Sequence, residues 1–408
     1  MRSRPTFRLA ATVSLMMIAL GCGVGSGSAH ASCNSQGHSG CTGGATGPVA
    51  QTYGFNDNAL FNPQIPREYF LDKLKSEGAS YLRSDINWQF YEPKYKQYDN
   101  GYWAQFDRNY QDLLAKGVHE VIILIGTPYW ALTPSGRGAT SPDGQFRCDG
   151  SDHACVAPPD IYQPQIRAEW KAFVRKVVTR YPKAAAIEVW NEPNIQYFWL
   201  QKQDPTLYAH LLAATTRAAH HVDPSMPVLA GSTADYVGQS DATNTSADVF
   251  LRDIYKAVGS NAFSAISWHF YPCNDGQSVA SQGDQLLGAL RKVRDSFGDL
   301  GKPLWLTEVG ASSGNSSCGG PGYGATGQAN ALVQALDWAR SQQKAHDDLP
   351  VVLVNELMDE ASRPALDVQN ASSDNEYGLV AYHYDANTGQ TTFVDKPAFA
   401  AVHSIIDR

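Results

Sequence analysis

The sequence predicts an α/β protein built as a single (β/α)8 TIM barrel. Three observations predict this fold class: eight short apolar segments alternate with amphipathic ones, most of the eight are near-continuous apolar runs, and the chain has 408 residues. Strands of a parallel sheet read as continuous apolar runs because helices cover the sheet. A barrel of eight βα units needs roughly 250 residues or more, so one such domain fits this length.

The expected strands and helices follow one another in regular alternation. The strands are 52–55, 80–86, 120–125, 185–190, 228–231, 264–270, 303–307 and 351–355, and the helices include 103–116, 166–181, 207–219, 286–297, 329–339 and 399–406. Apolar residues recur every three or four positions in the helices, and Gly117 ends the first of them. An open doubly wound sheet is the alternative, but no glycine-rich dinucleotide loop follows the first strand.

Residues 1–31 have the pattern of a secretory signal peptide. Basic residues precede an apolar run at 9–20, which is too short for a mature membrane-spanning helix, and small residues follow at a cleavage site. Residues 19–22 also resemble a lipoprotein processing site, in which Cys22 would carry the lipid. We therefore expect a secreted, extracellular protein with no transmembrane segment in the mature chain, and a lipid anchor through Cys22 as the alternative.

The rest of the chain reads as one domain behind a short leader. Residues 32–50 are rich in Gly, Ser and Thr and show no periodic pattern, which indicates a flexible leader. No repeat or low-complexity linker divides residues 51–408, which we assign to the barrel as one domain.

Six cysteines remain besides Cys22, an even number that fits disulfides in an oxidising compartment. The sequence does not select among the 15 connectivities that six cysteines allow. Chain proximity favours the local pairs Cys148–Cys155 and Cys33–Cys41. Cys273 and Cys318 follow neighbouring strands and form the third expected pair. No Cys-x-x-Cys or His-rich cluster appears, so we expect no metal.

Charge restricts the class of partner. The chain has 32 Lys and Arg against 40 Asp and Glu, a formal net charge of −8, and no run of basic residues in the mature part. Nucleic-acid affinity comes mostly from neutralising phosphates, so we expect no nucleic-acid partner. We expect a monomer.

Polar and aromatic residues gather where the expected strands end, which is where barrel enzymes place their chemistry. Glu192 follows the fourth strand and Glu308 the seventh, so the two face each other across the mouth of the barrel. Two carboxylates across a cleft can split a glycosidic bond. Export and the lack of a glycine-rich phosphate loop after strands seven and eight speak against an enzyme of phosphorylated metabolites.

The segment 190–194, Trp-Asn-Glu-Pro-Asn, resembles the acid/base motif of the large clan of retaining glycoside hydrolases with (β/α)8 barrels. The segment 306–310, Leu-Thr-Glu-Val-Gly, resembles its nucleophile segment, and residues 269–272, His-Phe-Tyr-Pro, resemble its strand-six His-x-Tyr. Arg83 matches the clan's strand-two arginine. The resemblance covers nearly all of residues 51–408 and is closest to glycoside hydrolase family 39, with family 5 next.

This resemblance implies roles for five site residues. Glu192 is the expected acid/base, Glu308 the nucleophile, and Asn191 holds the sugar 2-hydroxyl. Arg83 and Tyr271 keep Glu308 ionised and oriented.

Two further residues complete the expected site. His269 lines the sugar subsite, and Trp130 is a candidate sugar platform, carried by the long segment 127–165. Three structural alternatives stay open: an Arg83 ion pair with Asp85 or Glu92, a structural His269, and Trp130 as loop core.

Strand eight departs from the clan. Residues 354–359, Val-Asn-Glu-Leu-Met-Asp, lack the aromatic that many members stack on the sugar, so the glycone subsite is expected to differ. We expect a secreted retaining glycoside hydrolase that cleaves a poly- or oligosaccharide by double displacement and needs no cofactor. The alternative is a catalytically silent carbohydrate-binding barrel.

Overall fold

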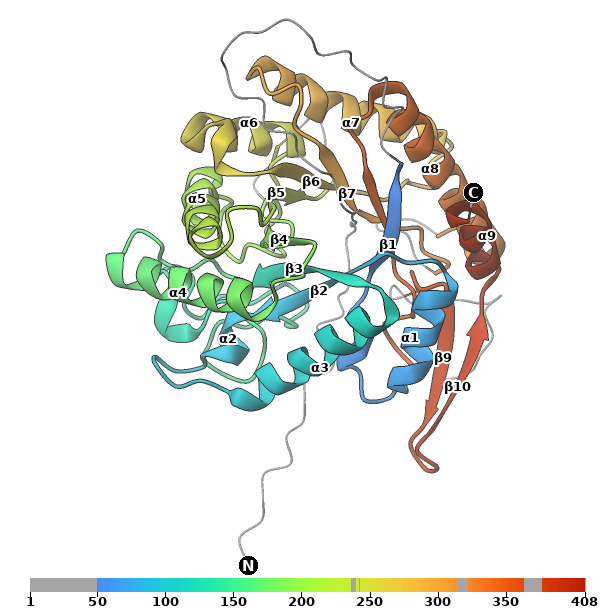
Figure 1. The fold of residues 1–408 in the computed structure, drawn as a ribbon, viewed down its shortest axis with the longest axis horizontal. Coiled ribbons are helices and arrows are strands. Elements are labelled where there is room, and N and C mark those ends of the chain that lie inside the picture. The colour runs from blue at the N-terminus through green and yellow to red at the C-terminus, as the bar shows by residue number, and fades with distance from the viewer. Residues whose placement is uncertain (1–49, 236–239, 242, 315–321, 363–375, 408) are drawn as a thin grey trace, which may run out of the picture.

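The fold is a closed barrel of eight parallel strands surrounded by helices (Figure 1). A computed structural model describes residues 50–235, 240–241, 243–314, 322–362 and 376–407. The strands follow one another around the barrel in chain order, and the eighth pairs with the first to close it. The predicted single (β/α)8 barrel is therefore confirmed.

The elements of the barrel lie in the order that the sequence predicts. The strands are β1 (Thr52–Asn56), β2 (Tyr81–Asn87), β3 (His119–Ile125), β4 (Ala186–Val189), β5 (Val228–Thr233), β6 (Ala265–Phe270), β7 (Leu304–Val309) and β8 (Val351–Asn355). The helices are α1 (Arg67–Ser76), α2 (Trp88–Tyr91), α3 (Asn100–Lys116), α4 (Pro164–Arg180), α5 (Pro205–Val222), α6 (Ala247–Val258), α7 (Val279–Ser296), α8 (Gly324–His346) and α9 (Pro397–Ile406). Each expected strand coincides with an observed one to within two residues at either end.

Local capping explains why several helices begin and end where they do. The side chain of Asp99 accepts hydrogen bonds from the first backbone N–H groups of α3, and Gly117 ends that helix with a φ of 81°. Asp204 caps α5 in the same way, and proline stands at the start of α4 and α5. The two aspartates satisfy N–H groups that a helix cannot pair internally, and proline has no N–H to leave unpaired in the first turn.

The sequence analysis missed α1, α6 and an antiparallel hairpin, β9 (Val380–Asp385) with β10 (Gln390–Asp395). The hairpin lies beside α1 at one edge of the barrel (Figure 1). The rings of Tyr69 and Phe393 stack there with centroids 3.8 Å apart. The hairpin therefore packs on the outside of the barrel, away from the strand interior.

Three neighbouring strand pairs carry register shifts near their carboxyl ends. They fall between Gly231 and Thr233 in β5, between Trp268 and His269 in β6, and between Leu306 and Val309 in β7. Such irregularities re-aim side chains and are frequent beside active sites. Beyond the last shift in β6, His269 comes into register with Glu308.

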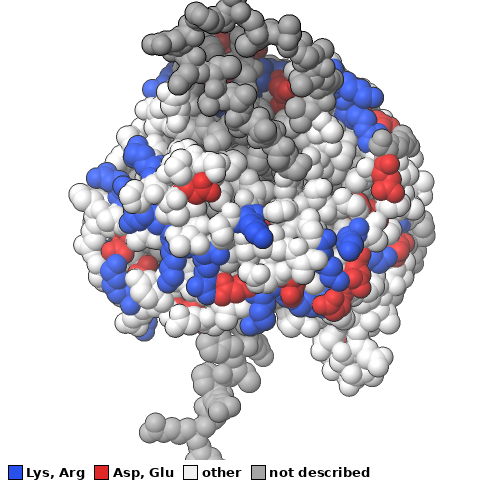
Figure 2. All heavy atoms as spheres, viewed as in Figure 1, with Lys and Arg blue, Asp and Glu red and all other residues white. Residues whose placement is uncertain are grey.

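The visible surface mixes both signs of charge. Figure 2 shows Lys and Arg interspersed with Asp and Glu across the described part of one face. No helix within the described ranges is long and apolar enough to cross a membrane. The expected signal peptide 1–31 and nearly all of the leader 32–50 lie outside the described residues.

Candidate active site

The chain after β4 turns sharply and carries Glu192 into the mouth of the barrel. Trp190 and Glu192 have φ angles of 70° and 42°, in the left-handed region that L-residues rarely adopt. Trp190 Nε1 donates to the carbonyl of Phe198 at 2.6 Å, and the backbone N–H of Glu192 donates to the carbonyl of Ser232 at 2.9 Å. These bonds hold an otherwise unfavourable backbone and leave Glu192 buried.

Glu308 on β7 is held by two donors on other strands. Arg83 Nη1 donates to Glu308 Oε1 at 2.7 Å, and the Tyr271 hydroxyl donates to Oε2 at 2.9 Å. Gly310 makes room for this arrangement, because a Cβ at that position would lie 2.3 Å from Tyr271 Cε1. Both expected partners of Glu308 are therefore in contact with it.

Arg83 uses every N–H of its guanidinium group on protein acceptors. Its partners are Glu188 from Nε, Asn56 and Glu308 from Nη1, and Asn191 and Ser232 from Nη2. The side chain is 1% exposed. The structural alternative of an ion pair with Asp85 or Glu92 is wrong, since the paired carboxylates are Glu188 and Glu308.

Burial and neighbouring charges shift the pKa values of the two carboxyl groups. Burial, together with the charges of Glu308 and Asp235, raises the pKa of Glu192 well above its ordinary value. Burial also raises the pKa of Glu308, to about 8, although Arg83 and the Tyr271 hydroxyl act in the opposite direction. Glu308 is therefore the group of the pair that ionises first.

His269 lies between Glu192 and Ser232. Its Nδ1 is 2.9 Å from Glu192 Oε1 and its Nε2 is 2.9 Å from Ser232 Oγ. Burial, then the charge of Arg83, lowers the pKa of His269 well below its ordinary value, so the ring is neutral. Ser232 Oγ accepts from Arg83 and can donate its own proton to Nε2, which leaves Nδ1–H to donate to Glu192. His269 thus contacts the expected acid/base directly.

Glu192, His269 and Glu308 each offer one potential ligand atom, and the three atoms lie within 4.8 Å of one another. No other such group occurs among the residues that the structure describes. The guanidinium of Arg83 already lies 2.7 Å from Glu308, and this fixed positive charge opposes a second cation there.

A pocket that is partly open to solvent lies at this end of the barrel. Glu308, Asn191 and Arg83 line it. Its other lining residues are Asn56, Asp57, Asn58, Asp85, Asn87, Ile123, Ile125, Phe146, Ala154, Val156, Phe198, Glu356 and Glu360. The lining thus combines amide and carboxyl groups with an apolar wall.

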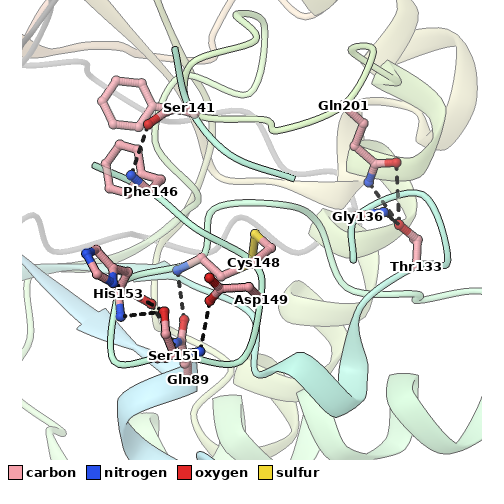
Figure 3. Close-up of a disulfide and its surroundings, with 12 residues drawn as sticks. Gln89, Thr133, Gly136, Ser141, Phe146, Cys148, Asp149, Ser151, His153 and Gln201 are labelled. Atoms are coloured by element: carbon pink, nitrogen blue, oxygen red, sulfur yellow. Dashed lines mark hydrogen bonds between the residues drawn. A yellow bond between two sulfur atoms is a disulfide. The ribbon is translucent and has the colours of Figure 1, made fainter. Parts of the chain in front are cut away.

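The long loop between β3 and α4 supplies part of that wall and is tied together by a disulfide. Cys148 and Cys155 are bonded, with their Cα atoms 4.7 Å apart, as predicted. Figure 3 shows Gln89 reaching this loop: its Nε2 donates to the carbonyl of His153 at 2.8 Å, and its Oε1 accepts from Cys155 N at 2.7 Å. The expected long loop is ordered and belongs to the pocket.

Trp130 is not among the residues that line this pocket. Its ring packs edge-on against Trp88 and Tyr95, and its Nε1 donates to the carbonyl of Glu92 at 3.2 Å. This position matches the loop-core alternative. A platform role at a more distant subsite stays a prediction.

The other expected cysteine pairs involve residues that the structure does not describe. Cys273 is disulfide-bonded. Its expected partner Cys318 lies outside the described residues, as do Cys33 and Cys41, so those pairings stay predictions.

The sequence analysis missed Asn56, Glu188 and Ser232, which all bind Arg83. Each is a polar residue in a strand that is mostly apolar: Glu188 lies inside β4, Asn56 ends β1 and Ser232 is next to the end of β5, and all three are buried. That contrast is the signal that could have found them, because buried polar groups need partners.

Residues 42–346 match the model of a family described as cellulase, glycosyl hydrolase family 5. A search of curated proteins finds no match.

Several solved structures share the fold. A family 39 glycoside hydrolase from Bacteroides cellulosilyticus WH2 matches with a TM-score of 0.58 and 17% identity, over 88% of this chain and 64% of that one. A family 39 β-xylosidase from Caulobacter crescentus matches with a TM-score of 0.55 and 22% identity, over 88% and 72%. An exo-β-1,4-mannosidase from Opitutaceae bacterium strain TAV5 matches with a TM-score of 0.55 and 16% identity, over 88% and 60%. The chain thus spans less than two thirds of the first and third of these structures.

Proposed function

Because the chain belongs to the cellulase family, glycosyl hydrolase family 5, and is an O-glycosyl hydrolase, we propose that it retains anomeric configuration, with Glu192 as acid/base and Glu308 as nucleophile. The expected kinship with both families 5 and 39 is consistent with the family match and the similar folds. The substrate class is a poly- or oligosaccharide.

The separation of the two carboxyl groups carries the proposal. An oxygen of Glu192 and an oxygen of Glu308 lie within 4.8 Å of each other. Retaining enzymes keep their carboxyl groups about 5–5.5 Å apart, whereas inverting enzymes need about 6.5–9.5 Å to seat a water. The short separation supports double displacement through a covalent glycosyl-enzyme.

The first step requires a proton on Glu192 and a charge on Glu308. Glu192 Oε1 faces His269 Nδ1, while Oε2 is buried without a hydrogen-bond partner. A proton on Oε2 is therefore free to move to the oxygen of the departing sugar. Glu308, held by Arg83 and Tyr271, attacks the anomeric carbon and forms an ester.

The second step uses the loss of charge on Glu308. The charge of Glu308 is among the causes that raise the pKa of Glu192. Once Glu308 is esterified this repulsion ends, so the pKa of Glu192 falls and the ionised carboxylate can take a proton from water. Water then cleaves the ester and restores both groups.

Two polar residues assist in the same scheme. Asn191 accepts from Arg83 through Oδ1 at 2.9 Å, so its amide nitrogen is the group available to the sugar 2-hydroxyl. His269 contacts Glu192 Oε1 and so orients the carboxyl group that transfers the proton.

The proposal includes export. Residues 1–31 are the signal peptide, 32–50 the leader and 51–408 the catalytic domain, and the product is secreted or lipid-anchored through Cys22. The Cys148–Cys155 disulfide supports an oxidising compartment.

Product stereochemistry tests the mechanism. Proton NMR during hydrolysis of a polysaccharide panel should show the anomer of the substrate as the first product. First-formed product of the opposite configuration would overturn the retaining mechanism. Absence of hydrolysis across the panel would favour the silent carbohydrate-binding alternative.

A further inference from the structure

The side of the pocket formed by β1 and β8 is lined by carboxyl groups. Asp57 follows β1, and Glu356 and Glu360 follow β8. We call these three residues the acidic wall. All three are at least nine-tenths buried, so they are part of the built site and not of its outer rim.

Asp57 fixes the chain that carries the other two. Its Oδ2 accepts from Leu357 N at 3.2 Å and from Met358 N at 3.0 Å, and its Oδ1 accepts from Ala59 N at 2.6 Å. The segment after β8 is thus anchored directly beyond Glu356. This is also the place where the aromatic of related barrels is missing from the sequence.

Glu356 Oε1 and Glu360 Oε2 are buried and have no hydrogen-bond partner. A buried acceptor without a donor is costly, so such atoms call for a ligand. The two side chains are 5% and 6% exposed and line the pocket.

Within the described residues, the lysine that acts on Glu356 and the arginine that lines the pocket already bind other protein groups. Lys396 donates to Asp359 Oδ1 at 2.6 Å, to Ser313 Oγ at 3.2 Å and to the carbonyl of Glu376 at 3.2 Å. Arg83, the only basic residue lining the pocket in the described ranges, has all its N–H groups on protein acceptors.

The acidic wall also interacts electrostatically with the expected nucleophile, Glu308. Burial raises the pKa of Asp57 to about 7. Burial and neighbouring carboxylates raise the pKa values of Glu356 and Glu360 well above the ordinary range, although the charge of Lys396 acts in the opposite direction at Glu356. The charge of Glu308 is one of the causes at Glu360. A positive group placed here would relieve repulsion that reaches Glu308.

We propose that the acidic wall binds the protonated amino group of an amino sugar, so that the substrate contains hexosamine units with free amines. This rests on the proposed function only in treating the pocket as a sugar subsite. An ammonium group brings three N–H donors to two acceptor oxygens that have none, and adds a positive charge to a wall on which Lys396 already acts at Glu356. A neutral sugar brings only hydroxyl donors, and a uronate would add negative charge to a wall that already carries three carboxyl groups.

Binding of non-hydrolysable monosaccharides to the wild-type protein tests this without depending on catalysis. Sugars with an amine at C2, C3 or C6 are each compared with the neutral parent and the N-acetyl derivative, by calorimetry at pH 6.5 and low salt. At least one amino sugar should bind about tenfold or more tightly than its parent, and acetylation should remove that preference.

Two double variants test whether the preference for amino sugars depends on the acidic wall. Glu356→Gln with Glu360→Gln should abolish it. Glu68→Gln with Asp72→Asn, which likewise replaces two carboxyl groups but on the exposed face of α1, should leave it unchanged.

Equal or tighter binding of every neutral parent, or no binding by any amino sugar, would overturn the proposal. Survival of the preference in the Glu356/Glu360 variant would also overturn it. Neither result bears on the stereochemistry of hydrolysis, and an inverted product would leave the binding comparison intact. The two proposals can therefore fail separately.

Discussion

Arg83 Nη1 on β2 lies 2.7 Å from Glu308 Oε1 on β7, so a cation and a carboxylate from distant strands meet inside the barrel. Tyr271 holds the second oxygen of the same carboxylate at 2.9 Å. These contacts fix the direction of the expected nucleophile and favour its ionised form. Because each contact comes from a different residue, single mutations can test each role separately.

Glu308→Gly should lower hydrolysis by at least about a thousandfold while the fold persists, because it removes the carboxylate that forms the ester. Azide should restore turnover of an activated substrate and give a glycosyl azide inverted relative to the substrate. Glu192→Gly with azide should give the retained azide instead, since azide then attacks the glycosyl-enzyme. The same configuration from both variants would contradict the assignment.

Glu192→Ala should slow substrates with poor leaving groups by about 10²–10⁴-fold and those with good leaving groups much less, because only the former need a proton from the enzyme. Steady-state kcat/KM across a leaving-group series measures this. A loss independent of leaving-group pKa would rule out Glu192 as the acid.

Tyr271→Phe should shift the acid limb of the pH profile of kcat/KM upward by about 0.5–1 unit. Burial already raises the pKa of Glu308 to about 8, and loss of the hydroxyl removes a bond that favours the ionised form. Activity then fades at a higher pH as the medium is acidified. Tyr323→Phe is the control, because its hydroxyl donates to Pro272 instead. An unmoved limb would refute the contact's role.

Gly310→Ala should reduce activity at least as much as Tyr271→Phe, since the new Cβ would lie 2.3 Å from Tyr271 Cε1 and 2.9 Å from the carbonyl of Asn355. Gly288→Ala on α7 is the matched control, because a Cβ there meets nothing within 4 Å. Kinetics and thermal melts of both variants distinguish displacement of the tyrosine from general unfolding. Full activity in Gly310→Ala would show that the ring tolerates the shift.

Glu120→Gln should reduce the loss of stability that accompanies a rise from pH 5 to pH 8. Burial raises the pKa of Glu120 to about 8, its Oε1 accepts from Ser84 Oγ at 2.8 Å, and its Oε2 has no partner. The folded state therefore holds a proton that the unfolded state releases above its ordinary pKa, and stability is lost as the pH rises towards 8. The change in Tm across this range should shrink by at least about 2 °C relative to wild type. Glu68→Gln, which is exposed, should leave it unchanged.

The barrel could be predicted because its strands are buried on both faces. β3 contains the apolar run 121–125 and β8 the apolar run 351–354, and the helices between strands carry clear stripes. The hairpin β9–β10 could not be predicted, because β10 is largely exposed and its polar and apolar residues alternate only weakly. α6 was missed although Phe250, Leu251, Ile254 and Tyr255 form one buried face.

The residues of the candidate site were likewise predictable only in part. Glu192 and Glu308 stand at strand ends beside recognisable neighbours, and Arg83, His269 and Tyr271 came from resemblance. Ser232 and Glu188 lie within strands, and their meaning depends on a partner across the barrel that linear order does not reveal. Glu356 was visible only as a departure in strand eight, and its place in the pocket required the fold.

The acceptors around Arg83 come from β1, β4, the segment after it, β5 and β7, so the guanidinium joins pieces that are remote along the chain. Neither half of the barrel alone contains the full set. A protein cut between β4 and β5 would hold Arg83 with Glu188 in one fragment and Glu308 in the other. Activity in such a split enzyme should return only when the fragments reassemble, which makes hydrolysis a direct reporter of fragment complementation.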